Sequence, residues 1–482
     1  MSRILPRSTP QAEGVDPAAV RGLVDHLDRL EDVHSLLVLR HGRVIAESWW
    51  HPHTADRPHT MFSVSKSFTA TAVGMAVHEG LLTVDDHVLD LLPDDAPADP
   101  GEFLRAMRVR DLLTMTTGHS ASTMEGIGRT ISLPGSRWAR AILAQPVEHE
   151  PGTHFLYNTG ATYLLSAILH RLTGERLLDY LTPRLLVPLG ITHAAWEQDP
   201  DGIDTGGFGL SITTEEMAAF GQLCLQGGVW EGQQLVPAEW VAAATSKQVP
   251  SGPHEWPEWN QGYGYQFWQC RHGAYRADGA FGQYILVWPD KDLVITMTSG
   301  LSDLQSVLDA VWDTLLPDDA WAGRSAAEEV PLAGPDTVVP SGLALATPDG
   351  APSSPIEQSL RGVTYELEPN PRDVSALRLG RDAYGRTEVA FTIGGLDHFA
   401  RFGHGEWSPG TCSLRGAPAD VATAAAWTDE STLRGRIMFL GTPFEWRLEL
   451  RFSREEVAVT IDRNVAFGER GLLDVRGRVR RT

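Results

Sequence analysis

Ser63 and Lys66 are the residues of this chain whose types and spacing most directly suggest chemistry. Positions three apart share one face of a helix, so the lysine amine can lie beside the serine oxygen. An amine placed there can accept the serine proton and make the oxygen nucleophilic without a histidine. Apolar neighbours within residues 61–68 would exclude water and lower the lysine pKa toward neutral pH. The pair therefore predicts a serine hydrolase that forms a covalent intermediate.

The segment that contains this pair favours a buried helix. Apolar residues recur at helical spacing from Val64 to Glu79, and Gly80 provides a stop. A helix that begins there directs its backbone amides and positive end toward a developing oxyanion. The simpler alternative is a solvated helix start in which Ser63 is only a cap, because this spacing also occurs by chance.

A turn-rich loop at residues 151–160 precedes another predicted helix and carries Tyr157 near its tip. A phenol held beside cationic groups can lose its proton, or pass one to a leaving group. The alternative is a tyrosine that packs the loop onto the core.

Glycines at residues 279 and 282 stand directly before a predicted strand. Glycine there allows close approach of the backbone to a ligand. The amide of Ala280 could then join the amide of Ser63 in an oxyanion hole. Taken alone, the same residues describe an ordinary glycine turn.

The remaining pattern up to residue 316 mixes strands and helices. A hairpin is predicted at 35–40 and 44–49, and two more strands at 284–288 and 293–298. Strands near both ends with helices between them imply one antiparallel sheet flanked by helices, beside an all-helical lobe. The other predicted helices are 18–30, 109–115, 162–172, 214–226, 237–244 and 306–315.

The pattern changes after residue 316. Residues 317–355 are rich in Pro, Ala, Gly and Asp, which is typical of a linker. Residues 356–482 alternate polar and apolar positions, which predicts a small antiparallel sandwich or barrel. The expected strands are 388–393, 433–439, 445–452 and 456–461. The predicted fold class is therefore α+β, with a hydrolase domain at 1–316 and a β-rich domain at 356–482.

Composition limits the partners and the compartment. The net charge is −22, from 40 basic and 62 acidic side chains, which disfavours nucleic acid and anionic membranes as partners. Three separated cysteines give neither a zinc spacing nor a disulfide framework, and the first residues lack the apolar run of a signal peptide. We therefore expect a cytoplasmic protein, with non-classical export as the alternative. His51, His53 and His59 lack a further ligand motif, so we interpret them as loop residues and expect no metal.

Taken together, these segments resemble the serine β-lactamase and penicillin-binding-protein superfamily. The resemblance is strongest to class C β-lactamase-like hydrolases, which include esterases, D-aminopeptidases and 6-aminohexanoate-dimer hydrolases. The matching blocks occur in one order, at residues 61–68, 111–118, 151–160, 207–214 and 262–268.

The resemblance implies roles for individual residues. Ser63 is similar to the acylated nucleophile, Lys66 to its proton acceptor and Tyr157 to the tyrosine that relays the proton. The amides of Ser63 and Ala280 match the oxyanion positions, and no cofactor is implied. The candidate substrate-binding residues are Asn158, Asp278, Gly279 and Gln283. The C-terminal part is similar to the lipocalin-like extensions of some of these hydrolases.

Two motifs depart from the family pattern. The second motif is usually Tyr-x-Asn, whereas here the asparagine, Asn158, directly follows the tyrosine. The third usually begins with a lysine or histidine, and Ala277 occupies that position, followed by Asp278. The missing cation would help to hold a substrate carboxylate, so β-lactams and peptides with a free carboxylate are disfavoured. Arg276 or His272 is the candidate replacement.

The main hypothesis is a hydrolase of small esters or amides. One rival is an acyltransferase or peptide cyclase that uses the same acyl-enzyme. A more distant rival is a non-catalytic ligand-binding or penicillin-binding module. The sequence indicates neither the physiological substrate nor the oligomeric state.

Overall fold

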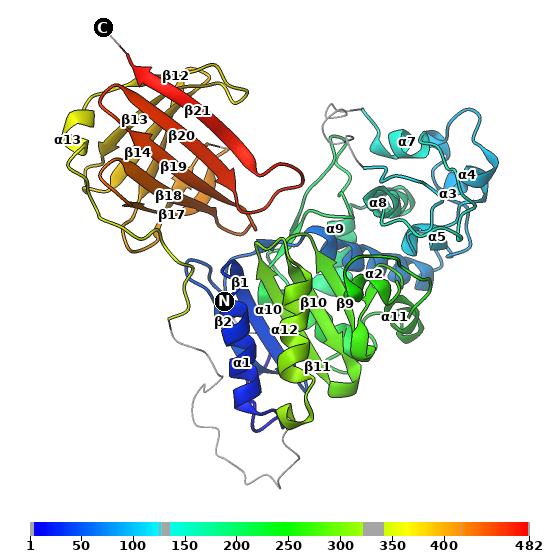
Figure 1. Cartoon of the computed structure of the whole chain (residues 1–482). Helices are drawn as coiled ribbons and strands as arrows, with labels where there is room; N and C mark the ends of the chain where they lie inside the picture. Colours follow the sequence, from blue (N-terminus) through cyan, green and yellow to red (C-terminus); the bar gives the residue numbers. More distant parts are fainter. Residues whose placement is uncertain (1–3, 125–126, 128–134, 322–341, 415, 481–482) are drawn as a thin grey trace.

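The computed structural model describes residues 4–124, 127, 135–321, 342–414 and 416–480. Figure 1 shows a β-sheet covered by helices, a helical lobe beside it, and a ten-stranded barrel-like sheet formed by the C-terminal part. The α+β prediction with a barrel-like C-terminal part is thereby confirmed. Much of the predicted linker, at 322–341, lies outside the described residues.

The central sheet of the N-terminal part has six strands in the order β2-β1-β11-β10-β9-β8. Neighbouring strands are antiparallel, and β11 from the end of this part pairs with β1 from its start. The strands are β1 (Val33–Arg40), β2 (Arg43–Trp49), β8 (Trp268–Gln269), β9 (Tyr275–Gly279), β10 (Gln283–Trp288) and β11 (Leu293–Ser299). Both ends of the segment thus close one sheet, as the sequence predicts.

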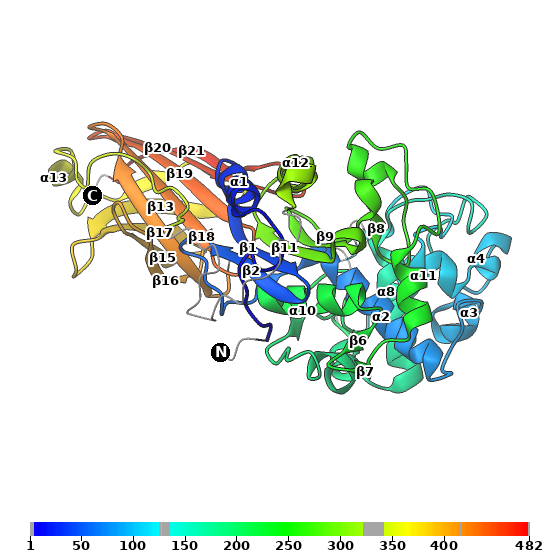
Figure 2. The ribbon, with the colours of Figure 1, turned by 90° about the horizontal axis from the view of Figure 1, so that it is seen from below.

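Helices cover both faces of this sheet. Figure 2 shows α1 (Pro17–Asp28) and α12 (Gln305–Leu315) on one side, and α2 (Ser65–His78) and α10 (Thr214–Leu225) on the other. The helix α1 buries the predicted apolar stripe, which includes Val20, Leu23 and Leu27. The helix α2 is buried over nearly all of its length because it lies between the sheet side and the helical lobe.

The helical lobe packs around α8 (Thr159–Thr173), which contacts α2, α5 and α7. Its other helices are α3 (Val88–Leu91), α4 (Glu102–Ala106), α5 (Val109–Leu113), α7 (Trp138–Leu143) and α9 (Leu177–Leu181), and α11 (Ala238–Thr245) packs on α2. Short strands β3 (His59–Thr60), β4 (Ala195–Trp196) and β5 (Leu210–Ile212) form a small separate sheet, and β6 (Val229–Trp230) pairs with β7 (Gln233–Gln234). This lobe holds the α2 and α8 N-termini against each other.

The C-terminal sheet runs in the order β15-β14-β13-β12-β21-β20-β19-β18-β17-β16. Its two ends meet, because β15 contacts β16 and Gly403 forms a bridge with Ala424. The short helix α13 (Glu357–Leu360) precedes it. The strands are β12 (Tyr365–Leu367), β13 (Val374–Arg381), β14 (Thr387–Ile393), β15 (Leu396–Phe402), β16 (Ser408–Cys412), β17 (Ala419–Trp427), β18 (Thr432–Phe439), β19 (Glu445–Phe452), β20 (Glu456–Arg463) and β21 (Gly471–Val479).

One end of the barrel contacts the N-terminal part near the start of α2 (Figure 1). The amide of Thr60 donates to the Gly441 carbonyl at 2.9 Å, and the Asn464 side chain donates to the Gly300 carbonyl at 3.2 Å. Arg447 forms an ion pair with Asp32 at 3.0 Å. Barrel loops are therefore held beside the segment that carries Ser63.

No helix within the described part of the chain is long and apolar enough to cross a membrane. The three cysteines, Cys224, Cys270 and Cys412, are free and buried.

Candidate active site

Ser63 lies in a one-turn 3-10 helix, Phe62–Val64, that leads directly into α2. Its Oγ is 3.0 Å from the Nζ of Lys66, so the predicted contact across one helical turn is present. Phe62 has a positive φ of 48°, which is rare for a bulky residue and marks a constrained backbone. That turn exposes Ser63 and Phe62 to the cleft, while Met61 and Val64 stay buried.

Lys66 is almost completely buried, with 1% of its surface exposed. Its Nζ also donates to the Gly207 carbonyl at 2.7 Å and to the Thr159 hydroxyl at 3.2 Å. Burial lowers the pKa of Lys66 to about 7, and the negative charge of Asp278 opposes that decrease. A large share of the amine is therefore neutral near pH 7 and able to accept a proton.

Tyr157 lies against the same amine, with its ring centroid 4.9 Å from the Lys66 Nζ. The ring stacks on Trp268 with centroids 5.4 Å apart. Burial and the charge of Asp278 raise the pKa of Tyr157 above its usual value, and a hydrogen bond with Ser63 acts in the opposite direction. The phenol is therefore protonated at neutral pH, which suits passing a proton and argues against a resident phenolate.

Gly279, the last residue of β9, approaches the backbone of the turn that carries Ser63. A Cβ at this position would lie 2.3 Å from the Met61 carbonyl oxygen and 3.2 Å from the Ser63 nitrogen. Only glycine permits that approach. Ala280 follows and lines the cleft with Ser63. This placement suits an oxyanion hole formed by the amides of Ser63 and Ala280, which stays a prediction.

Gln283 is not among the described residues that line the cleft, so its role in substrate binding stays a prediction. The side chain is fully buried, and its Nε2 donates to the carbonyls of Ala280 at 3.1 Å and Ser299 at 2.9 Å. Its Oε1 accepts from the Ser299 amide at 3.3 Å. Gln283 therefore holds the turn that carries Ala280.

Asn158 is fully buried and is not among the described residues that line the cleft, so its contact with substrate stays a prediction. Its Oδ1 caps α8 by accepting from the Gly160 amide at 3.1 Å, and it accepts from the Thr123 hydroxyl at 2.8 Å. The neighbouring Thr159 reaches Lys66 instead. The sequence signal that could have identified Thr159 is its place two residues after Tyr157, where the family pattern has its asparagine.

Asp278 lies in the cleft wall and forms a buried ion pair with Arg276, Nε to Oδ2 at 2.9 Å. Arg276 is 0% exposed and stacks on Trp259, with its Cζ 4.3 Å from the ring centroid. His272 lies against Trp312 at a centroid distance of 5.0 Å. Neither Arg276 nor His272 lines the cleft, so neither replaces the missing cation.

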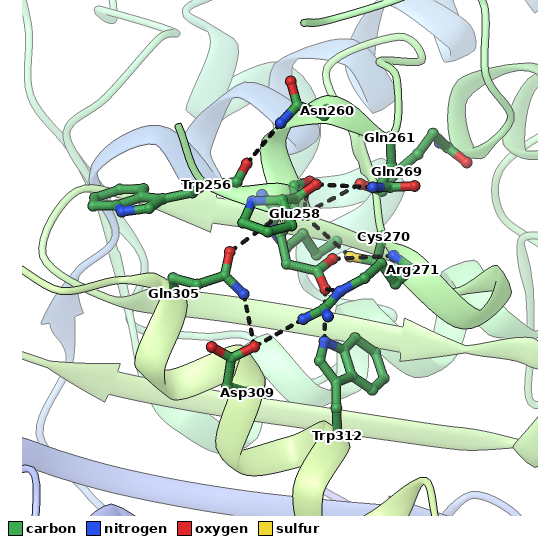
Figure 3. Close-up of polar contacts among 12 residues, drawn as sticks. Trp256, Glu258, Asn260, Gln261, Gln269, Cys270, Arg271, Gln305, Asp309 and Trp312 are labelled. Atoms are coloured by element: carbon green, nitrogen blue, oxygen red, sulfur yellow. Dashed lines mark hydrogen bonds and ion pairs between the residues drawn. The ribbon is translucent and has the colours of Figure 1, made fainter. Parts of the chain in front are cut away.

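The cleft wall that carries Trp259 rests on the network drawn in Figure 3. Glu258 is fully buried and accepts from the Trp312 indole at 2.7 Å and from the Arg271 amide at 3.0 Å. Arg271 reaches on to Asp309 of α12 at 2.8 Å. These bonds hold the turn at Pro257–Asn260 against α12, so Trp259 has a fixed position in the cleft wall.

The cleft has a volume of about 1940 Å³ and receives residues from both parts of the chain. Phe62 of the N-terminal part lines the cleft with Phe444 and Phe467 of the barrel loops, and the ring of Phe281, which is outside the lining, packs against them. The Phe281 and Phe467 ring centroids are 4.7 Å apart, and those of Phe62 and Phe444 are 6.1 Å apart. We call these four residues the aromatic wall. Among the described residues, the carboxylates that line the cleft are those of Glu197, Asp278 and Glu469.

The histidines predicted to lie in a loop are more ordered than expected. His59 is in β3, and both His53 and His59 are buried beside His34. The rings of His34 and His53 stack with centroids 3.7 Å apart, and Nδ1 of His34 is 3.2 Å from Nε2 of His59. No grouping of His, Cys, Asp or Glu among the described residues has the geometry of a metal site.

Comparisons with known proteins place these features in a family. A family model described as Beta-lactamase matches residues 20–312. The 6-aminohexanoate-dimer hydrolase of Paenarthrobacter ureafaciens is 26% identical over 60% of this chain and 78% of that protein. Penicillin-binding protein 4 of Amycolatopsis lactamdurans is 27% identical over 55% of this chain and 77% of that protein. The octameric penicillin-binding protein homologue from Pyrococcus abyssi covers 95% of this chain and 99% of its own, with a TM-score of 0.52 and 16% identity.

Proposed function

Because the chain belongs to the beta-lactamase family, we propose that it hydrolyses small esters or amides through an acyl-enzyme on Ser63. The observation that carries this proposal is the 3.0 Å contact between the Ser63 hydroxyl and the Lys66 amine at the cleft. The lowered pKa of that amine, about 7, supports its role as the base.

In the proposed acylation, the neutral amine of Lys66 accepts the hydroxyl proton while the Ser63 oxygen attacks the substrate carbonyl carbon. The amides of Ser63 and Ala280 donate to the oxyanion that forms. Collapse of the tetrahedral intermediate breaks the bond to the leaving group. The Tyr157 phenol gives that group its proton and takes one from the Lys66 ammonium. Water then attacks the acyl carbon by the reverse sequence and restores Ser63.

The lining of the cleft supports a substrate that is neutral, or cationic, with an apolar group near the aromatic wall. Glu197 and Glu469 bring negative charge, whereas Asp278 is paired with the buried Arg276 and adds little net charge. A substrate carboxylate would be repelled by this charge and would meet no arginine among the described residues of the cleft lining. We therefore expect p-nitrophenyl esters to be cleaved and nitrocefin, an anionic β-lactam, to be cleaved negligibly.

The direct test is labelling with a fluorophosphonate, followed by mass mapping, beside a panel of esters, amides and nitrocefin. We expect one adduct on the peptide that contains Ser63, and turnover of esters. An adduct on another residue, or none, would contradict the proposal. Binding without turnover across the panel would favour the non-catalytic module, and amide or ester products formed from added amines or alcohols would favour acyl transfer.

The pH dependence of ester cleavage should follow the amine of Lys66. Because the base form is the neutral amine, kcat/KM should rise about tenfold per pH unit below the Lys66 pKa of about 7, and level off above it. The raised pKa of Tyr157 keeps the phenol protonated throughout. Initial rates at several pH values, with protein integrity checked at each, measure this. A profile that falls as pH rises through 7 would exclude Lys66 as the base.

Shortening Phe467 tests the aromatic wall. This ring is 68% exposed, so Phe467→Ala should fold normally. Loss of its apolar contact should lower kcat/KM about 5- to 10-fold for a p-nitrophenyl ester with a long acyl chain, and less than about 2-fold for the acetate. Tyr384→Ala removes a more exposed barrel aromatic, 86% exposed and outside the cleft lining, and serves as the matched control. Equal losses of kcat/KM for both esters would show that the aromatic wall does not contact the acyl chain.

A further inference from the structure

The end of the barrel that faces the N-terminal part contains a second cavity of about 380 Å³. It opens among the ends of β14 and β20 and the starts of β13, β19 and β21. This volume falls within the range of roughly 300–1,000 Å³ that is usual for small-molecule sites. The lining residues are Arg372, Val374, Phe391, Ile393, Leu414, Phe444, Trp446, Ile461, Arg463, Leu472 and Leu473.

The side chains that line this cavity are almost all apolar, and the charged ones are both cationic. Apart from the two arginines, every lining side chain is aliphatic or aromatic, and no carboxylate is present. The catalytic cleft, in contrast, is lined by Glu197, Asp278 and Glu469. Two adjacent cavities of one molecule therefore have opposite charge preferences.

Arg463, the last residue of β20, is the better placed of the two cations. Its Nη2 donates to the Glu469 carbonyl, which holds the guanidinium across this end of the barrel. Its buried Nε has no hydrogen-bond partner among the described residues. A buried polar group without a partner is costly, and an anion beside an arginine supplies charge-assisted hydrogen bonds. Arg372 adds positive charge from the exposed loop before β13.

We propose that this cavity binds an apolar molecule that carries one anionic group, of the class of medium-chain carboxylates. The hydrocarbon chain lies among the aliphatic and aromatic side chains, and the carboxylate meets Arg463. Phe444 lines both this cavity and the catalytic cleft, so a bound molecule contacts a ring of the aromatic wall. The lining of this cavity contains neither Ser63 nor Lys66, so ligand binding there does not depend on the proposed hydrolysis.

Calorimetric titration of the full-length protein with decanoate tests this site, with decanol and acetate as the uncharged and short-chain arms. We expect one decanoate per chain, no detectable binding of acetate, and at least about tenfold weaker decanoate binding in Arg463→Met. Decanol affinity should be the same in the wild type and in Arg463→Met. Arg476→Met removes an equal charge from the exposed face of β21 and should leave decanoate binding unchanged.

Two further measurements separate this cavity from the cleft. Ile393→Trp, at a half-buried lining position, should fill the cavity and abolish decanoate binding. Protein whose Ser63 carries a phosphonate should still bind decanoate with wild-type affinity. The proposal is overturned if decanoate binds Arg463→Met as tightly as the wild type, or if Arg476→Met weakens binding equally. It is also overturned if Ser63 labelling alone removes binding, which would place the ligand in the cleft.

Discussion

Alanine in place of Ser63 should reduce kcat/KM for a p-nitrophenyl ester on the order of 10⁴-fold or more, and should abolish fluorophosphonate labelling. In the proposed mechanism the Ser63 oxygen becomes acylated, and among the described residues only Thr159 places another hydroxyl within hydrogen-bond distance of Lys66. The removed group is one partly exposed oxygen, so the fold should persist. Initial rates and a thermal melt of both proteins measure the two effects.

Ser122→Ala provides the matched control, because it removes the hydroxyl of another serine in the cleft lining without touching Lys66. Its activity should stay within about tenfold of the wild type. If Ser63→Ala keeps activity near that of Ser122→Ala, the acyl-enzyme proposal fails, whatever the labelling shows.

The contact between Ser63 and Lys66 could be predicted because it depends only on local geometry. Residues three apart on a helix meet whatever surrounds them, and the apolar run after Lys66 ensures burial of that helix. The position of Tyr157 needed the resemblance to known hydrolases, since a loop tyrosine alone does not reveal its neighbour. The structure places its ring over the Lys66 amine as that resemblance implies.

The side-chain amides could not be assigned from the sequence. Asn158 and Gln283 stand next to cleft residues in the chain, yet their amides bond to Thr123 and Ser299, which are distant in sequence. An amide can bind substrate or satisfy buried backbone groups, and only tertiary contacts decide which. The contribution of Thr159 to Lys66 was also missed, although its place two residues after Tyr157 offered a signal.

Four strands of the C-terminal sheet were predicted, whereas β12, β13, β15, β16, β17 and β21 were not. The patterns that predict β14, β18, β19 and β20 have apolar residues at every second position over most of their length. In contrast, the sequence of β16 is Ser-Pro-Gly-Thr-Cys, which is typical of a turn. It is a strand here because it pairs with β17. Barrel loops reach the cleft through contacts across the whole chain, so Phe444 and Phe467 carry no local signal of their position.

Methionine in place of Lys66 should lower kcat/KM for the same ester by about 10²- to 10⁴-fold. Methionine fills the buried space without a charge, while removing the only amine within reach of the Ser63 oxygen among the described residues. The hydroxyl of Ser63 then has no base, so both ester cleavage and the rate of fluorophosphonate labelling should fall together. Stopped assays of labelling over time, beside steady-state rates, measure both quantities.

Two companion variants sharpen the result. Lys66→Arg keeps a positive charge, but a guanidinium stays protonated at every accessible pH, so it should lose activity to a similar extent. Lys247→Met removes an exposed lysine outside the cleft lining and should retain wild-type rates. If Lys66→Arg keeps substantial activity, the role of position 66 is that of a fixed charge. The base would then have to be sought elsewhere, with the protonated phenol of Tyr157 an unsuitable substitute.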